Sequence, residues 1–357
     1  MSIIQAYRKL DAFAHAVFSI LFSKKYTRHY RMMYKENGIK LKKLTKQQKK
    51  EVRTCWGLKR FCVDYSTHEL YYSVTGEFDP RVCSEMLYRV KIDPLLNERK
   101  VNYAWDDKNY FDCFFPDVKF PFTLVRNIYG SFLDREYQLL KKDDVKEIVS
   151  SNLPVIIKPS QESGLSKNVE IIEEKDDIDK MLDRFHTNYI VQRVVEQCDE
   201  FKLFSPRSVN IMRIITVIID GKPQFMSASL RANTENAIAD NRITADGRGM
   251  LVIGINRNGT LKETGIYSCG VQMHSLPNGV VFSGFNIPSF EKAVQMALKA
   301  HERMPMLRAV GWDITIDKNY EPLIIEYNLK GMGIYLYQLA NGPLFGEYTQ
   351  DIVKMLM

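Results

Sequence analysis

The stretch GWDITIDKNYEPLIIEYN, residues 311–328, reads as two short apolar strands joined by a turn. With a four-residue loop at 318–321, Asp313 lies directly opposite Glu326. Asn328 follows two residues later and therefore shares the face of Glu326. Two carboxylates opposite each other repel, and apolar neighbours worsen the repulsion because the local dielectric is low. We therefore expect a positive group between them.

Spacing alone leaves two interpretations of this carboxylate pair. In the structural one, Asp313 and Glu326 pair with arginines or face water. In the one we favour, Asp313, Glu326 and Asn328 are ligands of Mg²⁺, which takes oxygen donors and usually combines one or two carboxylates with substrate phosphates.

A lysine follows a second apolar strand. Lys158 comes directly after residues 155–157, and the loop behind it contains Ser163 and Gly164. Such a lysine commonly extends its amine to solvent. Strand, lysine and Ser/Gly loop together also fit a phosphate-holding flap, because glycine lets backbone amides approach an anion and hydroxyls add donors.

Two further segments carry polar residues on apolar strands. YIVQRVVEQ, residues 189–197, is either an ordinary strand or an edge that presents backbone groups to an adenine. Arg213 in IMRIITVII and Arg231 in MSASLRA each need a carboxylate or phosphate partner. Structural salt bridges would satisfy them equally well. Asn241 follows in a loop that could fold over a site.

The composition is that of a globular protein with two or three domains: 357 residues, 26% charged and 45% hydrophobic. Six scattered cysteines without a CxxC pair favour a reducing compartment and argue against a disulfide framework or zinc site. No apolar run approaches the ~20 residues of a membrane-spanning helix. We therefore expect a cytoplasmic protein.

The basic residues are concentrated at the N-terminus. Residues 1–60 contain 16 Lys+Arg and 3 Asp+Glu, whereas the remainder contains 34 and 40. This arm either presents a solvated helical face or contacts anionic lipid at the inner face of the cytoplasmic membrane. Nucleic acid is not expected as a partner, because no RRM, helix-turn-helix or zinc-finger pattern is found. The apolar residues that recur at helical spacing in the arm are Leu10, Phe13, Ala14, Val17, Phe18 and Leu21.

Three regions follow from these patterns. Residues 1–60 form a basic helical arm, residues 61–150 an N-terminal α/β region, and residues 151–357 the body with the nucleotide and metal residues. In the body, strands are interrupted by helices and several strand pairs are antiparallel hairpins, which indicates an α+β fold.

The pattern Asp-x12-Glu-x-Asn, downstream of a strand lysine and an apolar hinge strand, resembles the ATP-grasp superfamily. It is closer still to the sugar-transfer-associated ATP-grasp family. The segments that carry the resemblance are DKNYFD (107–112), VIIKPSQESG (155–164), YIVQRVVEQ (189–197), SVNIMRIITV (208–217), SLRANTENAIADN (229–241), FSGFNIP (282–288) and the terminal hairpin. The resemblance implies an ATP-grasp fold, in which two α+β lobes clasp ATP, with a helical N-terminal region.

The resemblance also implies roles for individual residues. Lys108 and Lys158, with Ser163 and Gly164, would hold ATP phosphates. The adenine hinge and ribose contact would comprise Gln192, Arg193, Val195 and Glu196. Transfer would be assisted by Arg213, Arg231 and Asn241, and Mg²⁺ would be bound by Asp313, Glu326 and Asn328.

The implied activity is an ATP-dependent ligase that joins a carboxylate to an amine through an acylphosphate. The family name suggests a sugar or uronic acid of bacterial surface polysaccharide as the acceptor, with a separate amine donor. Two alternatives remain open: an ATP-dependent kinase acting on a sugar hydroxyl, and a nucleotide-binding scaffold without activity in a glycosylation complex. The loop QESGLSK carries one glycine where many ATP-grasp loops carry two or three, so the expected flap departs from the family pattern.

Overall fold

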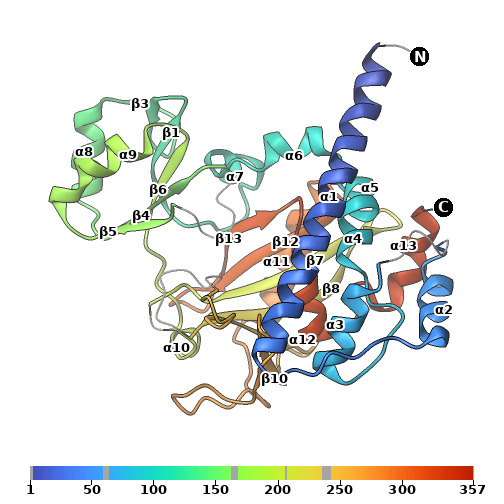
Figure 1. Cartoon of the computed structure of the whole chain (residues 1–357). Helices are drawn as coiled ribbons and strands as arrows, with labels where there is room; N and C mark the ends of the chain where they lie inside the picture. Colours follow the sequence, from blue (N-terminus) through green and yellow to red (C-terminus); the bar gives the residue numbers. More distant parts are fainter. Residues whose placement is uncertain (1–2, 59–63, 162–167, 206, 235–242, 357) are drawn as a thin grey trace.

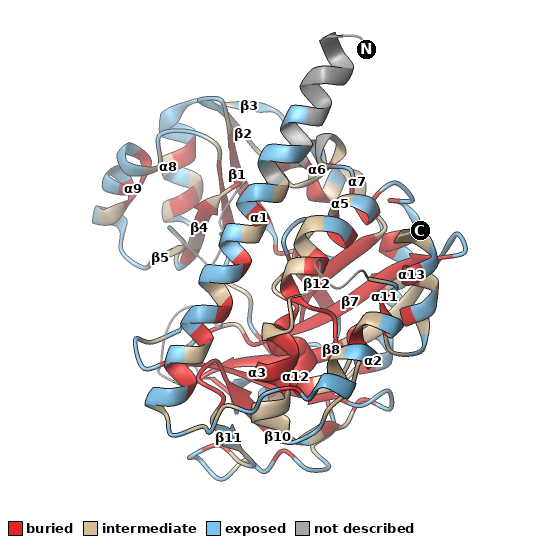
Figure 2. Ribbon diagram, turned by 45° about the vertical axis from the view of Figure 1, so that its right-hand side comes forward, coloured by how far each residue is buried: buried red, intermediate tan, exposed pale blue. Residues whose placement is uncertain are grey.

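The computed structural model describes residues 3–58, 64–161, 168–205, 207–234 and 243–356. Figure 1 shows a helical N-terminal region, a small lobe built on one sheet, and a larger lobe built on a second sheet. Buried residues concentrate on the strands of the larger sheet and on the helices that face it (Figure 2).

The N-terminal region is helical up to Phe114 within its described residues. Its elements are α1 (Ile3–Glu36), α2 (Lys46–Cys55), α3 (Ser66–Thr75), α4 (Glu85–Leu87), the π-helix η2 (Tyr88–Ile92), α5 (Asp93–Leu96), α6 (Arg99–Trp105), η3 (Lys108–Tyr110) and α7 (Phe111–Phe114). The C-terminal part of α1 is anchored to the larger lobe, because the hydroxyls of Tyr34 and Tyr335 lie 2.7 Å apart in the core.

The small lobe is an antiparallel sheet with the strand order β3-β2-β1-β6-β4-β5. Its elements are β1 (Thr123–Ile128), β2 (Ser131–Leu133), β3 (Leu139–Leu140), α8 (Lys142–Ser150), β4 (Val155–Pro159), β5 (Glu170–Ile172), η5 (Lys175–Asp177), α9 (Ile178–Phe185) and β6 (Tyr189–Arg193). The sequence-based division at residue 150 falls within this sheet, because β1 pairs with β6.

A separate apolar core holds the small lobe together. Val145 and Val149 of α8 and Met181 of α9 pack with Val125 and Ile157 of the sheet. Apolar residues one helical turn apart place α8 and α9 on the same face of the sheet. The other face is therefore left toward the larger lobe (Figure 1).

The larger lobe is an antiparallel sheet with the strand order β11-β10-β9-β8-β7-β12-β13. Its elements are α10 (Asp199–Lys202), β7 (Ile211–Ile219), β8 (Lys222–Asn233), β9 (Met250–Ile255), β10 (Leu261–Tyr267), β11 (Gln272–Met273), α11 (Phe290–Glu302), β12 (Ala309–Ile316), β13 (Pro322–Asn328), α12 (Tyr335–Asn341), η6 (Gly346–Tyr348) and α13 (Thr349–Leu356).

Helices α11 and α12 cover opposite faces of this sheet. Thr216 of β7 contacts His301 of α11 at 2.7 Å, whereas Arg213 of β7 lies over the ring of Tyr337 of α12. Residues three apart on a strand point to opposite sides. The α12 face is the one that carries the charged residues of the terminal hairpin.

The terminal hairpin has the expected facing pair but not the expected loop. Asp313 lies opposite Glu326, as predicted. The turn begins one residue earlier than expected, because Ile316 faces Pro322. A β-bulge restores the register between Asp313 and Ile314, and it leaves Ile325 as the extra residue on β13. The agreement at Asp313 therefore results from two offsetting one-residue differences.

Candidate functional site

Two buried lysines meet the terminal hairpin where the lobes face each other. Lys158, on β4, is 6% exposed, and Lys108, on η3, is 7% exposed. The Lys108 ammonium lies 3.6 Å from the carboxylate of Glu326 on β13. The backbone amide of Lys108 donates to the carbonyl of Ser160 at 2.9 Å, which joins η3 to the end of β4. Residues from three distant segments thus form one charged centre.

The ammonium of Lys158 lacks a full counter-charge. Among the described residues it makes no hydrogen bond or ion pair. Burial, and then the charge of Lys108, lower the pKa of Lys158 to about 8, and Glu326 acts in the opposite direction. A buried ammonium with a lowered pKa is a favourable partner for an anionic ligand, because the ligand supplies the missing charge.

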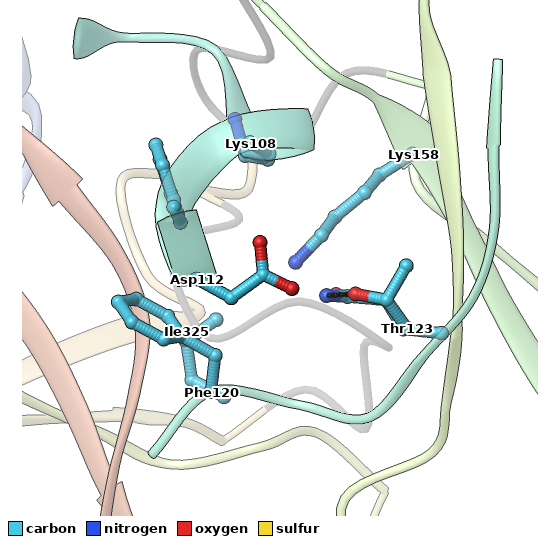
Figure 3. A pocket seen from close by; sticks show the side chains of 8 residues that line it. Lys108, Asp112, Phe120, Thr123, Lys158 and Ile325 are labelled. Carbon is cyan, nitrogen blue, oxygen red and sulfur yellow. Dashed lines mark hydrogen bonds between the residues drawn. The ribbon is translucent and has the colours of Figure 1, made fainter. Parts of the chain in front are cut away.

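These lysines line a pocket between the lobes. In Figure 3 the ammonium of Lys158 and the carboxylate of Asp112 point into the same space beside Thr123. The lining residues are Lys108, Phe111, Asp112, Phe120, Thr123, Lys158, Gln192 and Ile325. The enclosed free space admits about one water molecule. A nucleotide therefore enters this pocket only if the lobes separate or these side chains move.

The predicted hinge strand contributes one side chain to the pocket. Gln192, at 5% exposure, donates from its amide nitrogen to Thr123 Oγ1 at 3.2 Å and to the Pro121 carbonyl at 3.3 Å. Its carbonyl oxygen is buried without a hydrogen-bond partner among the described residues. That oxygen could accept a hydrogen bond from a bound amino group.

The other predicted hinge residues lie outside the pocket lining. Arg193 is exposed; its guanidinium donates to Asn152 Oδ1 and lies over the ring of Phe122. Val195 is half-buried in the link that follows β6. Glu196 is exposed and forms an ion pair with Lys318 in the hairpin turn at 3.2 Å. Nucleotide contacts by these three residues remain predictions.

The positive groups beside Asp313 are two arginines. Arg213 is bidentate, with Nε at 2.6 Å and Nη2 at 2.9 Å from the carboxylate, and Arg231 Nη2 lies at 3.1 Å. Burial would raise the pKa of Asp313, but the two guanidiniums hold it below its usual range. Asn328 Nδ2 also lies 3.3 Å from Asp313 Oδ2. The structural interpretation of Asp313, an aspartate paired with arginines, is therefore realised.

The predicted Mg²⁺ ligands fit a divalent cation unequally. The Glu326 carboxylate is 29% exposed and faces the lysines. The amide nitrogen of Asn328 donates a hydrogen bond to Asp313, which leaves the amide oxygen of Asn328 available as a metal ligand. Asp313 Oδ1 accepts from Arg213, and Oδ2 from Arg213, Arg231 and Asn328, so a cation bound to Asp313 would lie beside two guanidiniums and be repelled by their charge. No group of three His, Cys, Asp or Glu that could hold a metal occurs within the described parts of the chain.

Three predicted site residues cannot be placed. Ser163 and Gly164 of the expected phosphate flap, and Asn241 of the loop after β8, lie outside the described residues.

The sequence analysis missed an arginine and an aspartate beside the pocket. Arg126 of β1 is completely buried; it forms an ion pair with Asp112 and lies 4.3 Å from the centre of the Tyr137 ring. This contact fixes the Asp112 carboxylate at the pocket wall. The available signal was the same as for Arg213: an arginine within an apolar strand needs an anionic partner.

The two antiparallel lobes, with lysines on one side of the pocket and an acidic hairpin on the other, have the arrangement that the ATP-grasp resemblance implied. Residues 182–354 match the family described as sugar-transfer associated ATP-grasp, and this match confirms the resemblance expected from the sequence.

The solved structures that this chain resembles include two ligases and a carboxylase. An L-amino acid ligase from Bacillus licheniformis is 13% identical over 70% of this chain and 48% of its own, with a TM-score of 0.39. The ATP-grasp ligase PsnB complexed with a minimal precursor is 13% identical over 73% and 64%, with a TM-score of 0.44. A biotin carboxylase from Campylobacter jejuni is 10% identical over 70% and 46%, with a TM-score of 0.43.

This chain thus spans 46% to 64% of the length of these proteins. No curated protein matches the sequence.

Proposed function

We propose that this protein is an ATP-dependent ligase that activates a carboxylate as an acylphosphate and couples it to an amine. The observation that carries the proposal is the buried Lys158 ammonium, which forms no ion pair among the described residues and lies in a pocket also lined by Lys108. Phosphate groups supply a counter-charge, and two ammonium groups are suited to hold a polyphosphate.

The rest of the pocket suits a nucleoside better than a free phosphate. Phe111, Phe120 and Ile325 provide apolar surface for a planar base. The side-chain carbonyl oxygen of Gln192 has no hydrogen-bond partner among the described residues, and Gln192 lines the same pocket. This oxygen could accept a hydrogen bond from the adenine amino group. These features support ATP as the phosphate donor.

The transfer step needs no protein nucleophile. A carboxylate oxygen of the acceptor attacks the γ-phosphorus, the bond to the bridging oxygen breaks, and ADP leaves. Lys108 and Lys158 hold the phosphates in position, and the cluster of two arginines with Asp313 carries one net positive charge that stabilises the transferring group. Mg²⁺, held by Glu326 and Asn328 when bound, would neutralise charge that develops on the phosphates.

The second step releases the phosphate. The nitrogen of the amine attacks the acyl carbon, phosphate leaves with the electron pair of the C–O bond, and the nitrogen loses a proton to give an amide. From the family description we propose a sugar or uronic acid of a surface polysaccharide as the carboxylate substrate and an amino acid as the amine donor.

A product screen tests this proposal. Full-length protein is incubated with ATP, Mg²⁺ and pairs of hexuronic acids and amino acids, and ADP, phosphate and product masses are measured. We expect ADP, phosphate and an amide in equal amounts with one acid–amine pair. A phosphorylated sugar without free phosphate would show a kinase instead. If both Lys158→Met and Lys108→Met retain ATP binding, the nucleotide binds elsewhere.

The screen needs a matched control variant. Lys180 lies on α9 of the same lobe, and its side chain is 78% exposed. Lys180→Met removes the same charge from the lobe without touching the pocket, so its ATP binding should equal that of the wild type.

A further inference from the structure

The N-terminal half of α1 exposes large apolar side chains. Figure 1 shows this part of the helix extending beyond the lobes, and Figure 2 shows its described residues as largely exposed. Leu10, Phe13, Phe18 and Leu21 are between 61% and 67% exposed. Single exposed apolar residues are ordinary, but a continuous row on a protruding helix marks an interaction site.

The opposite face of the helix already serves the fold. Ser19, Ser23 and Thr27 are buried at intervals of four residues, and Tyr30 and Tyr34 continue that face into the core of the larger lobe. Small polar residues thus face inward while large apolar residues face outward. This is the reverse of the usual amphipathic pattern, so the fold does not need the apolar row.

The apolar row continues into basic residues along the same line. At about 100° per residue, the exposed side chains within about 40° of Val17 are those of Leu10, Phe13, Leu21, Lys24, Arg28 and Lys35, and Phe18 lies beside this row. Arg31 falls on the same line but is half-buried and forms an ion pair with Glu69. Lys24, Arg28 and Lys35 are exposed. No Asp or Glu occurs between residues 12 and 35. The free face therefore changes from apolar at the distal end to cationic near the body.

We propose that α1 inserts its distal apolar face into one leaflet of an anionic lipid bilayer, with Lys24 and Arg28 at the level of the lipid headgroups. Leu10 to Leu21 spans about 16 Å of helix, roughly half of the ~30 Å hydrocarbon core. Apolar burial and attraction to anionic headgroups add together in interfacial helices. No described helix is long and apolar enough to span a membrane.

Charge favours a bilayer over a second copy of the chain. Parallel pairing of two α1 helices would bring Lys24 and Arg28 beside their own copies. Anionic lipid compensates these charges, whereas a parallel dimer opposes like charges. The inference does not depend on the proposed ligase activity.

Sedimentation with vesicles tests the proposal. Full-length protein is mixed with phosphatidylcholine vesicles that contain or lack 40% phosphatidylglycerol. We expect binding to the anionic vesicles, weakened at least about tenfold by the double variant Phe13→Ser/Phe18→Ser and by Lys24→Gln/Arg28→Gln. Leu139→Ser is the matched control, because Leu139 is 78% exposed on the small lobe. An unchanged far-UV circular dichroism spectrum and melting temperature verify that each variant is folded.

Three outcomes would overturn the inference. The wild type could fail to bind anionic vesicles, or bind neutral vesicles equally well. Alternatively, sedimentation velocity without lipid could show a dimer that the Phe13/Phe18 variant converts to a monomer, in which case the apolar face is covered by a second copy of the chain.

Discussion

Replacement of Lys158 by methionine should stabilise the protein while abolishing nucleotide binding. Lys158 is 6% exposed, and no described residue forms an ion pair or hydrogen bond with it. Methionine has a similar length and flexibility without the charge. The variant therefore removes the desolvation penalty of the ammonium and leaves most of its packing.

The magnitude follows from the pKa of Lys158. Burial and the neighbouring Lys108 lower the pKa from 10.5 to about 8. At 1.36 kcal/mol per pKa unit, the charged form destabilises the folded state by about 3 kcal/mol at pH 7. We expect Lys158→Met to recover between about 1 and 3 kcal/mol of the free energy of unfolding, because some contacts of the lysine stem are lost.

The pH dependence has a definite sign. Because the folded pKa lies below the unfolded pKa, the unfolded state binds more protons between about pH 8 and 10.5, and wild-type stability gains from this group as pH rises. The advantage of the methionine variant should therefore fall to roughly half by pH 9.5.

Urea unfolding at pH 7 and pH 9.5 measures this difference, with Lys180→Met as the exposed control. The same samples are titrated with an ATP analogue. A methionine variant that is less stable than wild type at pH 7, or a difference that does not shrink at pH 9.5, would refute the account of Lys158.

Three other results are expected. Asp313→Asn removes the negative charge beside the buried guanidiniums of Arg213 and Arg231, and it should lower the free energy of unfolding at pH 7 by about 3–5 kcal/mol in urea melts. The difference from wild type should shrink as pH falls below 3.8, because protonation of the wild-type carboxylate then removes its contribution to stability. A loss under about 1 kcal/mol would contradict this. ATP-analogue affinity should weaken above pH 8, by up to about tenfold per pH unit, because phosphate binding requires protonated Lys158; calorimetry in two buffers at pH 8.5 should show proton uptake, and a constant affinity from pH 7 to 9.5 would argue against the assignment. Glu326→Gln should reduce turnover at least about tenfold and raise the Mg²⁺ concentration needed, with metal-free nucleotide binding retained, whereas unchanged Mg²⁺ dependence would exclude Glu326 as a ligand.

The sequence predicted the hairpin pair because strand alternation and a short turn determine which residues face each other. It could not predict the β-bulge before Ile314, since the apolar run LII carries no sign of an extra residue. The bulge matters for the site, because it brings both Ile325 and Glu326 to the side of the lysines.

The identity of the positive partners was beyond the sequence. Arg213 and Asp313 are 100 residues apart, and their contact depends on β7 lying next to β12 in the sheet. The sequence indicated only that each arginine needed an anion and that the acidic pair needed a cation. Several pairings satisfied those needs equally, and Mg²⁺ was the preferred one.

The convergence of Lys108 and Lys158 came from the resemblance, since no periodicity relates a short helix to a distant strand. The position of Arg126 and Asp112 beside the pocket was not predicted from the sequence. Both lie in segments with a recognisable pattern, but the order of residues does not show that β1 faces the pocket.

A structure with a non-hydrolysable ATP analogue and Mn²⁺ would locate both the nucleotide and, through anomalous scattering, the metal. We expect phosphate oxygens within hydrogen-bond distance of the Lys108 and Lys158 ammonium groups, with the anomalous peak beside Glu326 and Asn328. Nucleotide density away from these lysines, with the pocket between the lobes unchanged, would contradict this expectation.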